Sequence, residues 1–174
     1  MTTDGLTFPP FALDGPVDVI DLSLPIHDGA PSYPSDPPCV VTPFLTIPEA
    51  VANTRTIAMG SHQGTHVDAP FHFLADGATV DQIPLAQTTG PAFLLDLGDR
   101  PARSALTVED FAGLDLQAGD RLVYRVGWDR QLHEPGYFAD MPRLTVEAAR
   151  FLAGRRLALL GMDMPTPNPE DMVE

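Results

Sequence analysis

The chain has 174 residues, of which 44% are hydrophobic and 20% charged, and its formal net charge at pH 7 is -14. This length suits one domain with a sizeable core, and the composition is that of a globular protein rather than a disordered one. The acidic balance argues against nucleic acid and anionic membranes as partners, because both would repel the protein.

The single cysteine, Cys39, excludes an internal disulfide and a zinc site built from several thiolates. The N-terminal stretch MTTDGLTFPPFALDG lacks the basic and apolar regions of a signal peptide. No apolar run reaches the length of a membrane span. We therefore expect a cytoplasmic protein that has no membrane partner.

The first half of the chain predicts strands that alternate with proline-rich loops. Residues 17–24 (VDVIDLSL) predict a strand, and the Pro/Gly/Asp-rich residues 25–38 predict the loop that follows it. Further strands are predicted at 39–47 and 54–60. Pro43 indicates that the first of these two is an edge strand or a bulged strand, since proline cannot donate a hydrogen bond.

The second half of the chain predicts alternating strands and helices. The predicted strands are 92–97, 121–126 and 156–162, and the predicted helices are 107–114 and 144–154. Thr107 and Thr145 are the expected N-caps of the two helices. The strand–helix–strand order at the end predicts a parallel pair of strands, and the long connection 127–143 is of a kind that is often functional. The whole pattern indicates one α/β domain with a mixed sheet.

The stretch SHQGTHVDAPFHF contains three of the five histidines, His62, His66 and His72, with Asp68 between the last two. On a straight strand His66 and Asp68 point the same way, but His62 and His66 lie roughly 13 Å apart. The chain must bend between them if both are to reach one point. Gly64 is the residue that permits such a bend, because it has no Cβ.

Two imidazoles and one carboxylate suit zinc, manganese or iron(II), with coordination positions left open for water and substrate. We therefore expect His62, His66 and Asp68 to be the ligands of a catalytic metal, and His72 to be a general base or acid beside it. Two alternatives stay open. One is an iron(II) oxygenase that uses His66, Asp68 and His133, and the other is a non-catalytic metal-binding fragment.

The same stretch reads H-x-G-T-H-x-D-x-P-x-H-F from His62 to Phe73. In this pattern the chain resembles the cyclase-like metal-dependent hydrolases, a family that includes bacterial kynurenine formamidases and isatin hydrolases. The likeness extends to other motifs: D-L-S-x-P-I at 21–26, a P-G-D-P-like loop at 34–37, R-x-G-W at 125–128, L-x-x-E-A-A-x-x-L at 144–152 and G-x-D-x-P-x-x-N/D-P at 161–169.

The resemblance implies a swivelling β/β/α fold and the hydrolysis of an amide-type bond by metal-activated water, with a histidine as general base. It implies that His62, His66 and Asp68 hold Zn²⁺ or Mn²⁺, as one or two ions, and that His72 is the catalytic acid/base.

The resemblance also implies a substrate that is a small aromatic or cyclic amide, such as the aryl formamide N-formylkynurenine or a lactam. Tyr33 stands where the formamidases pack an aromatic residue on the substrate. The alternative for Tyr33 is a loop tyrosine that shields backbone. Phe73 is a second candidate for holding the aromatic part of the substrate.

The chain departs from the family at particular positions. The formamidases tend to have alanine in place of Thr65 and tyrosine in place of Phe73, so this chain is closer to the broad cyclase group. Family chains continue into a histidine-containing helix, a glutamate that helps to hold a second metal, and closing strands, whereas this chain ends at Glu174. We therefore expect one C-terminally incomplete domain over residues 1–174, an incomplete second metal site, and a homo-oligomer, at least a dimer, that covers the exposed strand faces.

Overall fold

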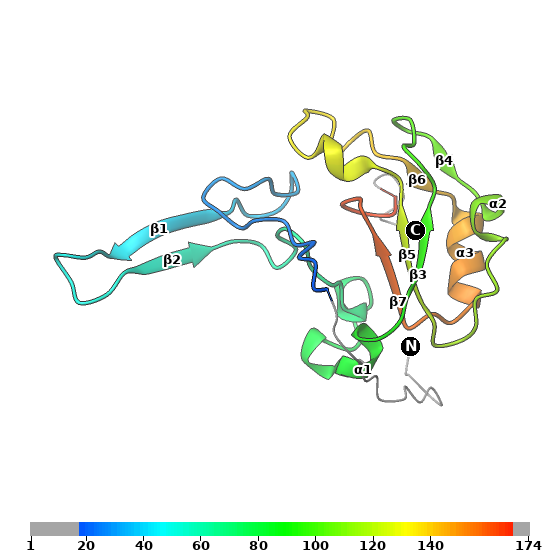
Figure 1. Cartoon of the computed structure of the whole chain (residues 1–174), viewed down its shortest axis with the longest axis horizontal. Coiled ribbons are helices and arrows are strands. Elements are labelled where there is room, and N and C mark those ends of the chain that lie inside the picture. The colour runs from blue at the N-terminus through cyan, green and yellow to red at the C-terminus, as the bar shows by residue number, and fades with distance from the viewer. Residues whose placement is uncertain (1–17, 169–174) are drawn as a thin grey trace.

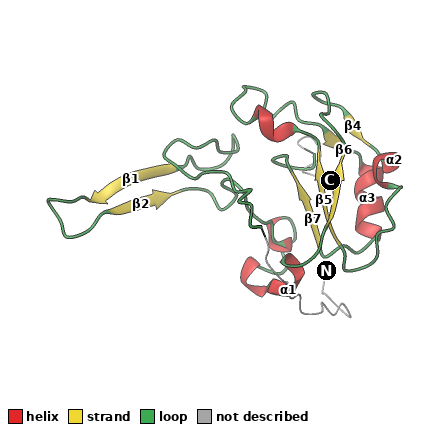
Figure 2. Cartoon of the chain, in the orientation of Figure 1, coloured by secondary structure: helices red, strands yellow, loops and turns green. Residues whose placement is uncertain are grey.

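The computed structural model describes residues 18–168, which form an α/β structure (Figures 1 and 2). The strands are β1 (Val40–Leu45), β2 (Thr54–Ala58), β3 (Phe93–Asp96), β4 (Ala105–Leu106), β5 (Arg121–Arg125), β6 (Arg143–Leu144) and β7 (Leu159–Met162). The helices are α1 (Leu85–Thr88), α2 (Val108–Phe111) and α3 (Val146–Gly154), and the 3-10 turns are η1 (Pro70–His72), η2 (Val80–Gln82) and η3 (Trp128–Gln131).

The strands are arranged in three sheets. β1 and β2 form an antiparallel hairpin, β3–β5–β7 form a parallel sheet, and β4 pairs with β6 in parallel. The predicted α/β class is confirmed, and the parallel and antiparallel strands lie in separate sheets. The predicted parallel pairing of the strands at 121–126 and 156–162 is also confirmed, because β5 and β7 are parallel neighbours.

The core lies where the parallel sheet packs against α2 and α3. Along β5 and the residue after it, Leu122, Tyr124 and Val126 are buried, and the residues between them are only half-buried. This period of two is that of a strand with one well-covered face. Phe111 of α2 meets Tyr124 edge to face, with 5.4 Å between the ring centroids, and Leu152 of α3 belongs to the same cluster.

Both helices in this core begin at the predicted N-caps. Thr107 and Asp110 form a capping box at the start of α2. At the start of α3, the backbone N–H of Ala148 donates to Thr145 Oγ1 at 3.2 Å. Each cap satisfies backbone groups that have no partner in the first turn of a helix.

The β1–β2 hairpin projects away from the parallel sheet (Figure 1). Nearly all of its side chains are exposed, including Phe44 and Ile57. The register shifts between Pro43 and Leu45, which confirms the bulge or irregularity that Pro43 predicts. A two-stranded hairpin is at best marginally stable alone in water, so its apolar side chains form a candidate contact surface.

The predicted strand at 17–24 is wrong over the residues that the structure describes. Residue 17 lies outside the described part, and residues 18–24 form no strand. The backbone N–H groups of Ser23 and Leu24 donate to the side chains of Asp21 and Thr65 instead of to a neighbouring strand. An apolar alternating run becomes a strand only where another strand supplies its hydrogen bonds.

Among the α-helices and strands, three were not predicted: α1, β4 and β6. Each of these strands spans two residues, which is too short for an alternating pattern to be recognised. The predicted long connection 127–143 holds η3 and the first residue of β6. Among residues 18–168, no helix is long and apolar enough to cross a membrane.

Candidate metal centre

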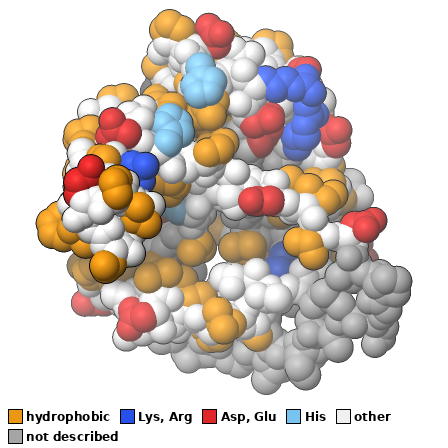
Figure 3. All heavy atoms as spheres, turned by 60° about the vertical axis from the view of Figure 1, so that its left-hand side comes forward, with side chains coloured by type: hydrophobic (Ala, Val, Ile, Leu, Met, Phe, Trp, Pro, Cys, Tyr) orange, Lys and Arg blue, Asp and Glu red, His pale blue; other side chains and the backbone are white. Residues whose placement is uncertain are grey.

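The histidine-rich stretch follows the hairpin directly, between the end of β2 and η1. It forms turns and bends rather than a strand. Seen from the side of the hairpin, the molecule exposes histidine side chains among hydrophobic ones (Figure 3). Most residues of the stretch are exposed, so it is open to solvent and to small molecules.

The structure brings His62, His66 and Asp68 together. His62 Nδ1 lies 2.6 Å from Asp68 Oδ1 and 3.2 Å from His66 Nε2, and His66 Nε2 lies 3.2 Å from Asp68 Oδ1. About a quarter of each imidazole and half of the carboxylate side chain are exposed, at 26%, 25% and 48%. Three donor atoms therefore converge at a surface that a ligand can reach.

The bend expected at Gly64 is present. Gly64 has a φ of +65°, a left-handed conformation that residues with a Cβ rarely adopt. The same turn orients His66, whose Nδ1 lies 2.9 Å from the carbonyl oxygen of Gly64. Because a carbonyl oxygen can only accept, Nδ1 is the donor of this hydrogen bond, and Nε2 is the ring nitrogen that faces His62 and Asp68.

This donor set fits a divalent cation. Ligand atoms about 2.0 Å from a tetrahedral ion lie about 3.3 Å from one another, close to the two 3.2 Å separations of His66 Nε2 from His62 and Asp68. The hydrogen bond from His66 Nδ1 to a backbone carbonyl is the kind of support that metal-binding histidines have. His62, His66 and Asp68 are therefore the residues that would hold the metal.

His72 lies beside this set, at the end of η1. Its ring stacks on His62 with 3.9 Å between centroids, and His62, Asp68 and His72 can each offer a ligand atom within 4.8 Å of the others. The sequence predicts His72 near the metal but displaced from it. The geometry permits that position and also permits direct ligation, so His72 is the member of the cluster whose role most needs a test.

Of the two predicted substrate-binding residues, Phe73 contacts the cluster and Tyr33 contacts Phe138. Phe73 is 60% exposed, and its ring centroid lies 4.1 Å from that of His72. Tyr33 is half-buried and meets Phe138 edge to face at 5.5 Å. His133, the third ligand of the alternative oxygenase site, is exposed and does not belong to the group of possible metal ligands.

The comparison with protein families decides the assignment. The family model described as "Putative cyclase" matches residues 20–169 of this chain. The chain belongs to the cyclase family. The family predicted from the H-x-G-T-H-x-D-x-P-x-H-F pattern is thus confirmed.

Several relatives and solved structures are similar to this cyclase-family chain. It is 30% identical over 154 residues to the kynurenine formamidase of Bacillus mycoides (strain KBAB4), covering 87% of this chain and 71% of the relative. A "predicted metal-dependent hydrolase" from Bacillus stearothermophilus matches with 29% identity and a TM-score of 0.70, over 87% and 71% of the two chains. Isatin hydrolase A from Labrenzia aggregata shares the fold, with 23% identity and a TM-score of 0.72 over 86% and 68%.

Gln63, which was not predicted from the sequence, joins the histidine-rich stretch of this cyclase-family protein to the loop that holds Pro31 and Ser32. Gln63 is 6% exposed; Ser32 Oγ donates to its Oε1 at 2.6 Å, and its Nε2 donates to the carbonyl oxygen of Pro31 at 2.7 Å. A buried amide with both ends bonded fixes the two segments that it joins. Position 63 is variable in the motif, so the sequence gives no signal for this role.

Proposed function

We propose that this protein is a metal-dependent hydrolase of an amide-type C–N bond, and that its substrate is an aryl formamide such as N-formylkynurenine or a cyclic amide. The observation that carries the proposal is the convergence of His62, His66 and Asp68 within 3.2 Å of one another. The kynurenine formamidase relative supports the bond type, because its name specifies a formamide.

A divalent cation, zinc or manganese in this proposal, would lower the pKa of a bound water and polarise the substrate carbonyl. His62, His66 and Asp68 would hold the cation, and the hydrogen bond to the Gly64 carbonyl orients the His66 ring with Nε2 toward the other two side chains. Within residues 18–168, the ligand atoms of His66 and of the trio His62, Asp68 and His72 gather at one place. The described residues therefore account for one ion, and a second ion requires ligands outside this group.

His72 carries the proton transfers in this proposal. Its imidazole takes a proton from the attacking water as the C–O bond forms, and returns a proton to the nitrogen as the C–N bond breaks. The products are a carboxylic acid and an amine, so atoms and charges balance. Phe73, in contact with the His72 ring, and Tyr33, on the neighbouring loop, would border the aromatic part of the substrate.

The test is a substrate screen on protein purified without chelator. Aryl formamides and cyclic amides should be hydrolysed, and the activity should disappear after metal removal and return with zinc or manganese. A lactone and a carbamate extend the panel to related bonds. Dioxygen consumption without a hydrolytic product would instead indicate the iron(II) oxygenase, and bound metal without any turnover would indicate the non-catalytic alternative.

We also propose that the protein forms a homo-oligomer through the β1–β2 hairpin. Phe44, Val51 and Ile57 are 72%, 100% and 60% exposed. Residues 39–61 contain one acidic and one basic residue, Glu49 and Arg55, in a chain with a net charge of -14. A nearly uncharged apolar arm is the surface through which two such acidic chains can meet with least repulsion.

Light scattering tests this assembly. The unmodified chain should scatter as a dimer or larger, and the double variant Phe44→Ser/Ile57→Ser should scatter as a monomer. Leu85→Ser is the matched control, since Leu85 is 82% exposed on α1, outside the hairpin. A monodisperse monomer of the unmodified chain would remove the proposal.

A further inference from the structure

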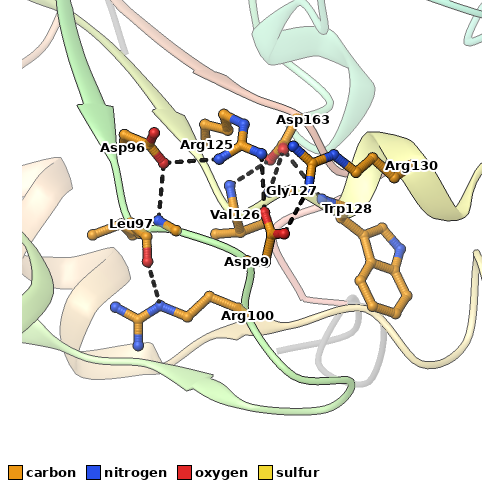
Figure 4. Close-up of polar contacts among 11 residues, drawn as sticks. Asp96, Leu97, Asp99, Arg100, Arg125, Val126, Gly127, Trp128, Arg130 and Asp163 are labelled. Atoms are coloured by element: carbon orange, nitrogen blue, oxygen red, sulfur yellow. Dashed lines mark hydrogen bonds and ion pairs between the residues drawn. The ribbon is translucent and has the colours of Figure 1, made fainter.

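Asp163 follows β7 at the carboxyl end of the parallel sheet, where β3 and β5 also end (Figure 4). Its carboxylate points at the backbone that leaves β5. The backbone N–H of Val126 donates to Oδ1 at 2.9 Å, and those of Gly127 and Trp128 donate to Oδ2 at 2.7 and 3.2 Å. One side chain thus fixes three consecutive backbone groups with charge-assisted hydrogen bonds.

The turn that Asp163 holds is conformationally demanding. Gly127 has a φ of +75°, and a Cβ at this position would collide with the carboxylate of Asp99. Val126, Gly127 and Trp128 are all buried, so their N–H groups depend on this protein acceptor instead of on solvent. Without the carboxylate the turn would lose the partners that define it.

A series of contacts connects this turn to Tyr33, through Trp128, Tyr137 and Phe138. Trp128 Nε1 donates to the carbonyl oxygen of Tyr137 at 2.8 Å, and both side chains are 7% exposed. The Tyr137 ring contacts Phe138 at 4.8 Å, and Phe138 contacts Tyr33 at 5.5 Å. Burial raises the pKa of the Tyr137 phenol, and the charges of Asp163 and Asp129 raise it further.

Tyr33, the last residue of this series of contacts, is linked to the candidate ligands through its neighbour in the chain. Tyr33 follows Ser32, whose hydroxyl donates to Gln63, and Gln63 follows His62. Phe138 is half-buried. Tyr33 and Phe138 therefore form a pair of aromatic rings contributed by two loops, and the Ser32–Gln63 hydrogen bond ties the Tyr33 loop to the candidate metal-binding stretch.

We propose that Asp163 is a positioning residue: by fixing the 126–128 turn it holds Phe138 against Tyr33, and these two rings form an aromatic wall that selects substrates with an aryl group. The selectivity part of this inference rests on the proposed amide hydrolysis. The positioning part concerns only this chain's own contacts, and it is measurable without turnover.

Asp163→Asn tests the positioning. The substitution keeps the shape of the side chain, but its amide nitrogen would face a backbone N–H donor on one side. Trp128 is the only tryptophan in the chain, so its emission reports on the turn directly. We expect a red shift of that emission and greater quenching by acrylamide in Asp163→Asn.

Asp99→Asn is the matched control. Asp99 is another carboxylate at the same sheet edge, and it accepts hydrogen bonds from the side chains of Arg125 and Arg130 rather than from the turn backbone (Figure 4). Its side chain is 62% exposed. We expect Trp128 emission in Asp99→Asn to match that of the unmodified protein, and equal shifts in the two variants would overturn the specific role of Asp163.

Selectivity is measured as kcat/KM for an aryl formamide divided by kcat/KM for an aliphatic formamide. We expect roughly a tenfold loss of this ratio in Asp163→Asn, mostly through KM of the aryl substrate, with metal content unchanged. Phe138→Leu should lose the same ratio while keeping the Trp128 emission. Because the two residues act through one wall, the double variant should lose no more than either single variant.

Several outcomes would overturn the inference. Unchanged emission and unchanged aryl preference in Asp163→Asn would do so, as would additive losses in the double variant. If Asp163→Asn does not fold, Phe138→Leu still tests the inference. An unchanged aryl preference in Phe138→Leu would show that Phe138 and Tyr33 do not form a selective wall. An unmodified protein that hydrolyses no amide overturns the proposed function and the selectivity with it, while the Trp128 emission still decides the positioning.

Discussion

Replacing His66 by alanine should remove the bound metal. His66 Nε2 is one of three donor atoms that lie within 3.2 Å of one another, and the hydrogen bond to the Gly64 carbonyl orients its ring toward the other two side chains. Loss of a partner that only supports a ligand costs roughly 10–100-fold in metal affinity, so loss of the ligand itself should cost more. The measurement is elemental analysis of metal per chain after purification without chelator.

His133→Ala is the control for this experiment. His133 is an exposed histidine outside the group, so the variant removes an imidazole without touching the three donors. It should retain the metal content of the unmodified protein. Stoichiometric metal in His66→Ala would show that His66 is not a ligand.

Replacing His72 by alanine should leave the metal in place and lower the hydrolysis rate by roughly 10²–10⁴-fold. The reason is that His72 supplies proton transfer in the proposal and the three donors remain. Metal content and kcat should be measured on the same preparation. Phe73→Leu is the neighbouring control: it removes the ring that contacts His72 and should raise KM more than it lowers kcat.

This second experiment distinguishes a proton-transfer role of His72 from a ligand role, because a nitrogen of His72 lies within 4.8 Å of ligand atoms on His62 and Asp68. If His72→Ala loses metal as His66→Ala does, His72 is a ligand. In that case the proton transfers belong to another group, and the division of roles within the cluster is wrong.

The features predictable from the sequence are those with a local physical cause. Thr107 and Thr145 indicate helix starts because a hydroxyl at an N-cap satisfies backbone groups of the next turn. The meeting of His62, His66 and Asp68 follows from spacing together with a glycine that can bend the chain. Each of these predictions depends on fewer than ten neighbouring residues.

The features that the sequence did not predict depend on distant partners. Residues 18–24 have the alternation of a strand, but no neighbouring strand among the described residues pairs with them. Gln63 and Asp163 act on backbone or side chains that are 31 to 37 positions away in the chain. Neither residue type reveals such a role until the fold is known.

Other expectations from the sequence stay predictions. They are the identity and number of the metal ions, the cytoplasmic location, the homo-oligomer, and the assignment of residues 1–174 to one C-terminally incomplete domain. Tyr33 and Phe73 as substrate contacts belong with them, although their contacts with Phe138 and His72 are compatible with that role.

The most direct test of the central claim is metal per chain plotted against hydrolysis rate, on matched preparations of the unmodified protein, His66→Ala and His72→Ala. The account predicts three separate results: metal with activity, no metal with no activity, and metal with little activity. An active His66→Ala protein without metal, or an unmodified protein whose rate does not follow its metal content, would contradict the account.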